Sequence, residues 1–197
     1  VKERWYRRYL VQRAFLLSVE LATPFYALHA ASQHVHKHGS LSTFVIASST
    51  ALVVSGIFWR RLSEVSSRLV FRVAAIMAIV AGLIASATEF DPALQSLWSH
   101  GAVFFLIVMA GQGTSNARTL YLMAWTSDED RPCFMAVSGV LIGALGILVA
   151  FFFGALAHMQ SAIWPVWCIV AINGLAFLYT WFLQERPREG TAAVENG

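Results

Sequence analysis

Long apolar stretches, separated by short polar connectors, dominate the pattern of hydrophobic and polar residues along this chain. Six of them are long enough to cross the roughly 30 Å hydrocarbon core of a bilayer as helices, which takes about 20 residues each. They cover Tyr9–Ser32, Leu41–Trp59, Leu69–Thr88, Gly101–Trp125, Cys133–Ala157 and Ala162–Leu183. All are roughly two to three times as long as a strand of a membrane barrel. The pattern therefore predicts an all-α, polytopic membrane protein with six transmembrane helices.

The composition supports a membrane protein over a soluble one. Hydrophobic residues make up 57% of the 197 residues and charged residues 13%, whereas soluble domains are about 45–50% apolar and about 25% charged. The excess apolar surface is expected to face the lipid bilayer. The formal net charge of +3 does not indicate a nucleic-acid partner, because the basic residues lie between the apolar stretches rather than on one face.

The connectors alternate in charge, which predicts the orientation. On one side lie ten Lys and Arg residues, which are Lys2, Arg4, Arg7, Arg8, Arg60, Arg61, Arg68, Arg131, Arg186 and Arg188. The connectors on the other side contain Lys37 alone. By the positive-inside rule we expect a multi-pass protein of the cell (inner) membrane with both termini in the cytoplasm. Residues 1–184 would form the transmembrane domain and the polar residues 185–197 a disordered cytoplasmic tail.

Tryptophans lie near several ends of these stretches. They are Trp5, Trp59, Trp98, Trp125 and Trp164. Because tryptophan favours the headgroup region of a bilayer, we expect these side chains to be interfacial anchors.

Glu20 is an ionisable residue about eleven positions into the first stretch, where a charge is costly. On a helix, Gln12, Glu20, Thr23 and Tyr26 fall within an arc of about 120°. Pro24 removes one backbone hydrogen bond and loosens the helix beside Glu20. The stripe predicts one wall of a substrate or proton pathway. The alternative is that Glu20 is a buried structural residue, either hydrogen-bonded or protonated.

The fourth stretch contains a second group of polar residues. Gln112, Ser115, Asn116 and Thr119 fall within an arc of about 100° and either line the same pathway or join helices by hydrogen bonds. Arg118 lies roughly 160° from Asn116 and about 10 Å from the cytoplasmic end by helical rise. We therefore expect Arg118 to pair with a loop carboxylate rather than to line the pathway.

The remaining candidate chemistry is sparse. His34, His36 and His38 alternate in one connector and would meet a zinc or nickel ion in an extended segment. A lysine between them repels a cation, so solvated loop histidines are preferred and no metal is expected. Cys133 and Cys168 lie in or beside apolar stretches, as packing residues do. No nucleophile elbow or nucleotide fingerprint occurs in the sequence, which favours a protein that is not an enzyme and needs no cofactor.

The connector after the second stretch resembles a motif of a known family. Its residues read WRRLSEVSSR, which is similar to the G-x-L-x-D-R-x-G-R loop between the second and third helices of each half in the major facilitator superfamily. Leu62 stands at the Leu position, Glu64 at the Asp position and Arg68 at the final Arg position. Arg60 replaces the first Gly and Val65 the central Arg. Such departures are typical of the second half of these transporters.

Two further stretches are similar to the same family. Gln112 and Gly113 look like the end of the R-x-x-Q-G motif of the fourth helix, although Met109 occupies the arginine position. The segment from Arg118 to Ser138 looks like the junction of the fourth and fifth helices in bacterial permeases. Together with the predicted topology, the resemblance extends over residues 9–183.

The resemblance implies a twelve-helix transporter of two six-helix halves, of which this chain is the C-terminal one. In that fold the first, second, fourth and fifth helices of each half line the substrate path, and the halves rock about a midplane site. We therefore predict secondary active or facilitative transport of a small solute, by symport, antiport or facilitation, with a second six-helix half as partner. Glu64, Arg68, Arg118 and Asp128 would form a cytoplasmic gate. A self-contained six-helix channel, a homodimeric carrier and a membrane-embedded enzyme are the alternatives.

Overall fold

The computed structural model describes residues 4–33 and 40–183, which form helices joined by short turns. The helices are α1 (Arg4–Glu20), α2 (Ala22–Ser32), α3 (Ser40–Ser63), α4 (Ser67–Phe90), η1 (Pro92–Leu94), α5 (Leu97–Trp125), α6 (Arg131–Met159), α7 (Ile163–Tyr179) and η2 (Thr180–Phe182). Neither described range contains a strand, so the predicted all-α class is confirmed. The predicted tail at 185–197 and the histidines His34, His36 and His38 lie outside these ranges.

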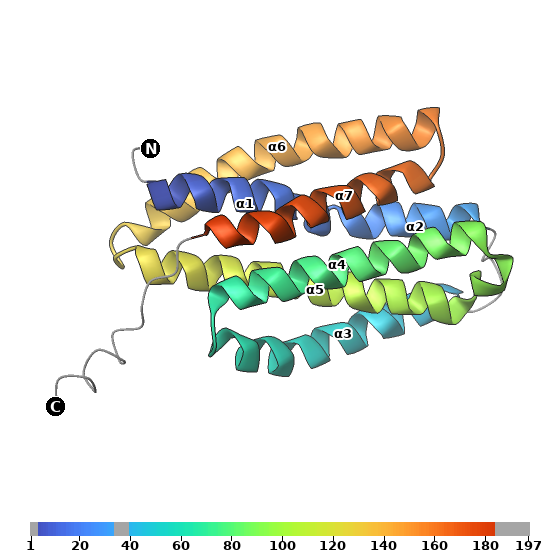
Figure 1. Cartoon of the computed structure of the whole chain (residues 1–197), viewed down its shortest axis with the longest axis horizontal. Coiled ribbons are helices and arrows are strands. Elements are labelled where there is room, and N and C mark those ends of the chain that lie inside the picture. The colour runs from blue at the N-terminus through green and yellow to red at the C-terminus, as the bar shows by residue number, and fades with distance from the viewer. Residues whose placement is uncertain (1–3, 34–39, 184–197) are drawn as a thin grey trace.

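The long helices lie side by side and run back and forth along the longest dimension of the molecule (Figure 1). Helices α1 and α2 follow one another, and together they span about the length that α5 or α6 spans alone. The start of α1 and the end of α7 lie at the same end of the bundle, which we call the terminal end. We call the opposite end, where α2 and α4 finish and α5 begins, the Glu89 end.

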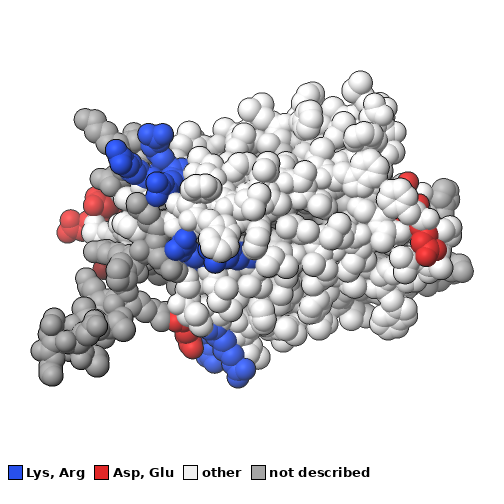
Figure 2. Space-filling model, viewed as in Figure 1, with Lys and Arg blue, Asp and Glu red and all other residues white. Residues whose placement is uncertain are grey.

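Five helical segments are long and apolar enough to cross a membrane. They are Arg4–Ser32, Ser42–Ser63, Ser67–Phe90, Arg131–Met159 and Ile163–Phe182. The fourth predicted span, Gly101–Trp125, forms α5 but is not among these five segments. Its second half contains the polar residues Gln112, Asn116 and Arg118. On the face shown in Figure 2, Lys and Arg gather toward the terminal end and a broad middle zone has no charged side chain. This arrangement is compatible with a multi-pass membrane protein.

Small residues allow the central helices to pack closely. Helix α4 packs against both α5 and α7, and turns a buried row of alanines and Gly82 inward. A Cβ atom added at Gly82 would collide with Val170 of α7, and one added at Gly113 of α5 would collide with the indole ring of Trp59. Close approach of backbones at such positions is typical of membrane helix pairs.

Trp59 is not the interfacial anchor that the sequence suggests. Its side chain is fully buried, and its indole Nε1 donates a hydrogen bond to the Met109 carbonyl over 2.9 Å. The indole lies in the space that Gly113 leaves open, so it joins α3 to α5. In contrast, Trp98 is 85% exposed near the Glu89 end.

The first predicted span is two helices rather than one. Helix α1 ends at Glu20, Leu21 separates the two, and α2 begins at Ala22. Pro24 has no N–H to donate to the carbonyl of Glu20, so the regular helical bonding pattern is interrupted there. The predicted span Tyr9–Ser32 therefore lies within one apolar segment, Arg4–Ser32, which is interrupted at Leu21, close to the loosening expected at Pro24.

Candidate functional site

An ion pair joins the end of α1 to the second half of α5. Arg118 Nη1 donates a hydrogen bond to Glu20 Oε1 over 3.1 Å, and Arg118 Nη2 donates to Ser115 Oγ over 3.3 Å. Ser115 and Arg118 lie three residues apart on α5, on neighbouring positions of the helix surface. The hydroxyl of Ser115 therefore helps to hold the guanidinium toward α1.

Glu20 is the last residue of α1, at the α1–α2 junction near the middle of the bundle in Figure 1, and Arg118 lies seven residues before the end of α5. Both side chains are partly open, at 38% relative exposure for Glu20 and 28% for Arg118. An exposed ion pair in the middle of an apolar bundle is unfavourable against lipid tails. If the bundle crosses a membrane, this part of its surface must face water or protein.

The structure assigns Arg118 to a different partner from the one that the sequence suggests. Its partners are Glu20 and Ser115, rather than the loop carboxylates Glu64 and Asp128. Asp128 instead lies 2.8 Å from Arg131, three residues along the chain. Arg68 Nη2 donates to the carbonyl of Trp181 over 3.2 Å. The expected gate pairing of Arg118 is therefore replaced by a contact with the pathway residue Glu20.

The predicted polar wall of the first span is divided. Glu20 and Thr23 are exposed, whereas Gln12 and Tyr26 are buried inside the bundle. Neither polar atom of the Gln12 amide, nor the hydroxyl of Tyr26, has a hydrogen-bond partner among the described residues. The interruption at Leu21 separates the two helix faces, so the arc calculated for one continuous helix does not describe this surface.

The polar residues of α5 face two sides. A hollow of about 320 Å³ lies between α3 and α5, and its lining residues are Gly56, Arg60, Ser63, Asn116, Thr119, Leu120 and Met123. Arg118 points instead toward α1. Gln112 and Ser115 are half-buried and do not line this hollow. Asn116 therefore faces α3 and Arg118 faces α1, as the wide angle between them on the helix implies.

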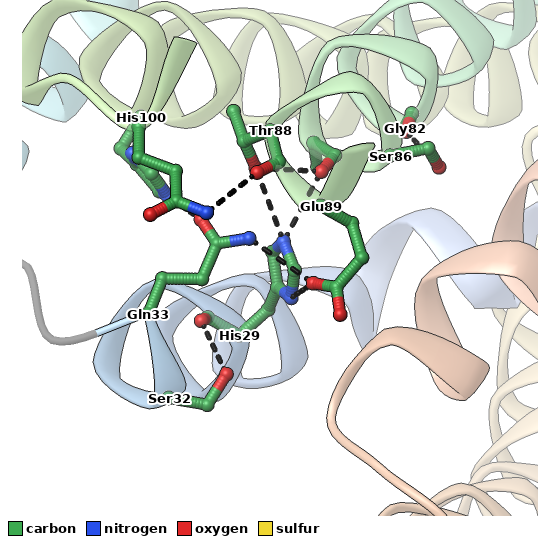
Figure 3. A network of polar contacts seen from close by, with 10 residues as sticks. His29, Ser32, Gln33, Gly82, Ser86, Thr88, Glu89 and His100 are labelled. Atoms are coloured by element: carbon green, nitrogen blue, oxygen red, sulfur yellow. Dashed lines mark hydrogen bonds and ion pairs between the residues drawn. The ribbon is translucent and has the colours of Figure 1, made fainter. Parts of the chain in front are cut away.

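A second polar cluster, which the sequence analysis did not identify, lies at the Glu89 end (Figure 3). His29 of α2 and His100 of α5 are both buried, at 1% and 2% exposure. His29 Nε2 lies 3.1 Å from the Ala85 carbonyl, and Gln33 Nε2 donates to Glu89 Oε2 over 3.1 Å. His100 Nε2 lies 3.1 Å from Gln33 Oε1. The cluster therefore links α2, α4 and α5.

The sequence contained a signal for this cluster. His29, Glu89 and His100 each lie close to the end of an apolar stretch, and the alternating topology brings these ends together. The sequence analysis placed Glu89 in a connector, whereas α4 continues to Phe90. Glu89 therefore lies on the last helical turn, next to α2.

Comparison with known proteins does not assign a family. No family model and no solved structure matches the chain. The chain is similar to uncharacterized proteins of Mycobacterium bovis and of two Mycobacterium tuberculosis strains, CDC 1551 and H37Rv, at 25% identity over 173 residues. The match covers 87% of this chain and 33% of each relative, so the chain spans about a third of the length of these relatives.

Proposed function

We propose that this chain is one six-helix half of a secondary transporter of the major facilitator type, which moves a small solute across the cell membrane by alternating access. In this proposal α1 and α2 form the first span, α5 forms the fourth, and both termini lie in the cytoplasm. The protein moves its solute without chemical conversion. The observation that carries the proposal is the partly exposed Glu20–Arg118 ion pair at the α1–α2 junction.

The cost of placing charge in a bilayer indicates what the Glu20–Arg118 pair faces. A charged side chain at the centre of a bilayer costs about 2.5–3.5 kcal/mol or more, and such residues face a bundle interior or a water-filled cavity. Glu20 also lies at a helix interruption, a feature that transporters place at their binding sites. A polar pathway over α1 and α5 accounts for both features.

Three observations support the presence of a second half. In the most apolar part of each helix, only 17% of α3 and 11% of α6 is buried inside the bundle, against 44% of α4. On α6, Gly139 and Gly143 have open space in front of them, which leaves a small-residue face available to another helix. The mycobacterial relatives are about three times as long as the matched segment, which leaves room for a second bundle.

The test measures uptake of labelled solute, together with solute-dependent proton movement, by the full-length protein in vesicles that contain a trapped pH dye. A panel of sugars, amino acids, small carboxylic acids and amines is supplied with and without an imposed pH gradient. Glu20→Gln should abolish gradient-driven accumulation and retain downhill exchange, since the amide keeps hydrogen bonds but cannot exchange a proton. Glu129→Gln, in an exposed turn, serves as the control. Unchanged gradient-driven accumulation by Glu20→Gln would remove Glu20 from the mechanism.

A further inference from the structure

At the Glu89 end, Gln33 connects a histidine to a carboxylate. His100 Nδ1 lies 2.9 Å from the carbonyl oxygen of Ser96, and His100 Nε2 lies 3.1 Å from Gln33 Oε1. The other end of the amide, Gln33 Nε2, donates to Glu89 Oε2. Carbonyl and amide oxygens only accept hydrogen bonds, so both ring nitrogens of His100 face acceptors. A neutral imidazole has one N–H and can satisfy only one of them.

On the other side of Glu89, the contacts of His29 determine which nitrogen carries its hydrogen. The Thr88 hydroxyl donates to the Ala85 carbonyl over 2.7 Å, and His29 Nε2 lies 3.1 Å from the same carbonyl and 3.3 Å from Thr88 Oγ1. In the neutral ring, Nε2 is therefore the donor and Nδ1 is an acceptor. Within the part of the chain that the structure describes, Nδ1 has no hydrogen-bond partner, and it lies 4.0 Å from Glu89 Oε2. Two lone pairs thus face each other (Figure 3).

A proton count over this chain of contacts shows a deficit. The hydrogen-bonded contacts are Ser96–His100, His100–Gln33, Gln33–Glu89 and His29–Ala85, and each needs one hydrogen. Two neutral imidazoles and the amide nitrogen supply three, while an ionised carboxylate supplies none. If the nitrogen and oxygen of the Gln33 amide exchange places, the His100–Gln33 contact gains a hydrogen and the Gln33–Glu89 contact loses one. The number of missing hydrogens is unchanged. One of these four contacts therefore lacks a hydrogen, and Glu89 Oε2 and His29 Nδ1 face each other over 4.0 Å with no hydrogen between them.

A hollow beside Glu89 gives protons access to this cluster, and few other charged side chains lie near it. Glu89 is 41% exposed and borders a hollow of about 530 Å³, lined by Ser32, Gln33, Glu89, Gln95, Ser161, Ala162 and Ile163. Glu89 is the charged residue in this lining. The elements packed against α2 are α5, α7 and α1. Of these, α5 contributes His100, α7 contains no Asp, Glu, Lys, Arg or His, and Glu20 at the end of α1 is paired with Arg118. Glu89 comes from α4 and reaches the site through its contacts with Gln33 and His29. Asp91, just beyond α4, accepts instead from the backbone N–H of Ala93.

We propose that His100, Gln33, Glu89 and His29 form a proton-binding site that takes up two protons as the pH falls. One proton completes the His100–Gln33–Glu89 connection, and the other enters between Glu89 Oε2 and His29 Nδ1. The net charge of the site then changes from −1 to +1, since one carboxylate faces two imidazolium rings. The second proton converts facing acceptors into an ion pair between α2 and α4. This proposal does not depend on a transport function.

The experiment is ¹⁵N nuclear magnetic resonance of the full-length protein labelled at histidine, in detergent, at pH 8 and pH 5.5. His29→Gln and His100→Gln identify the two signals. At pH 8, His29 should be neutral with its hydrogen on Nε2, and at pH 5.5 both rings should carry two hydrogens. A His29 ring that stays neutral at pH 5.5 would overturn the proposal.

Variants separate a proton-binding role from a structural one. Glu89→Gln should lower the ratio of protonated to neutral His29 at a fixed pH about tenfold, because it removes an opposite charge at close range. Asp91→Asn, two residues further along, should change it by less than about twofold. Gln33→Leu should lower the protonated fraction of His100 and leave that of His29 unchanged. An unchanged His29 ratio in Glu89→Gln contradicts the proposal.

Discussion

Arg118 on α5 donates a hydrogen bond to Glu20 at the end of α1 over 3.1 Å, although 98 positions separate the two residues. Each is an ionisable residue within a predicted span, and the sequence analysis assigned them to different sites. Their contact makes them one unit, in which each charge has a partner on another helix. Any solute or proton that binds to one of them must compete with the other.

The first prediction concerns the strength of this contact. A double-mutant cycle with Glu20→Gln and Arg118→Gln should show a coupling free energy of about 0.5–1 kcal/mol, because both side chains are partly exposed. The measurement is the free energy of unfolding in detergent of the two single variants, the double variant and the parent protein.

The control for this cycle is the pairing that the sequence suggests. Among the described residues Arg118 makes no ion pair with Glu64, so a cycle with Glu64→Gln and Arg118→Gln should give less than about 0.3–0.5 kcal/mol. Stronger coupling of Arg118 to Glu64 than to Glu20 would restore the gate hypothesis and refute the observed pairing.

The second prediction concerns the contact between α3 and α5. Gly113→Ala should lower the free energy of unfolding by about 1–3 kcal/mol, because the added methyl group overlaps the buried indole of Trp59. Chemical denaturation in detergent, followed by helical circular dichroism, measures this change.

Gly111 is the matched control on the same helix. A Cβ atom there meets nothing within 4 Å, so Gly111→Ala should be neutral or stabilising by up to about 1 kcal/mol through helix propensity. Equal effects at Gly111 and Gly113 would show that the packing of Trp59 against α5 is wrong.

The third prediction concerns the proposed orientation. In a variant without Cys133 and Cys168, a cysteine at Leu94 should react with an impermeant thiol reagent added to intact cells, and one at Val65 should not. Both side chains are exposed, at 43% and 67%, and they lie at opposite ends of the bundle. Both cysteines should react after the membrane is permeabilised. Labelling of Val65→Cys alone in intact cells would reverse the orientation.

Local sequence information was sufficient for much of the secondary structure. The stretch Leu69–Thr88 was expected to be helical, and α4 covers Ser67–Phe90. A continuous run of apolar residues determines this outcome by itself, because a helix satisfies its backbone hydrogen bonds within the segment. The ends follow from local chemistry as well: the Ser66 side chain accepts from the backbone N–H groups of Arg68 and Leu69.

The partners of polar side chains were decided by the tertiary structure. The burial of Trp59 depends on Gly113, and the neighbours of His29 depend on where α4 ends beside α2. These contacts join segments that are distant in sequence, and periodicity describes each helix alone. The sequence by itself therefore determined the helices, their apolar character and the interruption near Pro24. Only the packing of α1 against α5 decided that Glu20 and Arg118 meet, because an ion pair requires two specific faces at one depth.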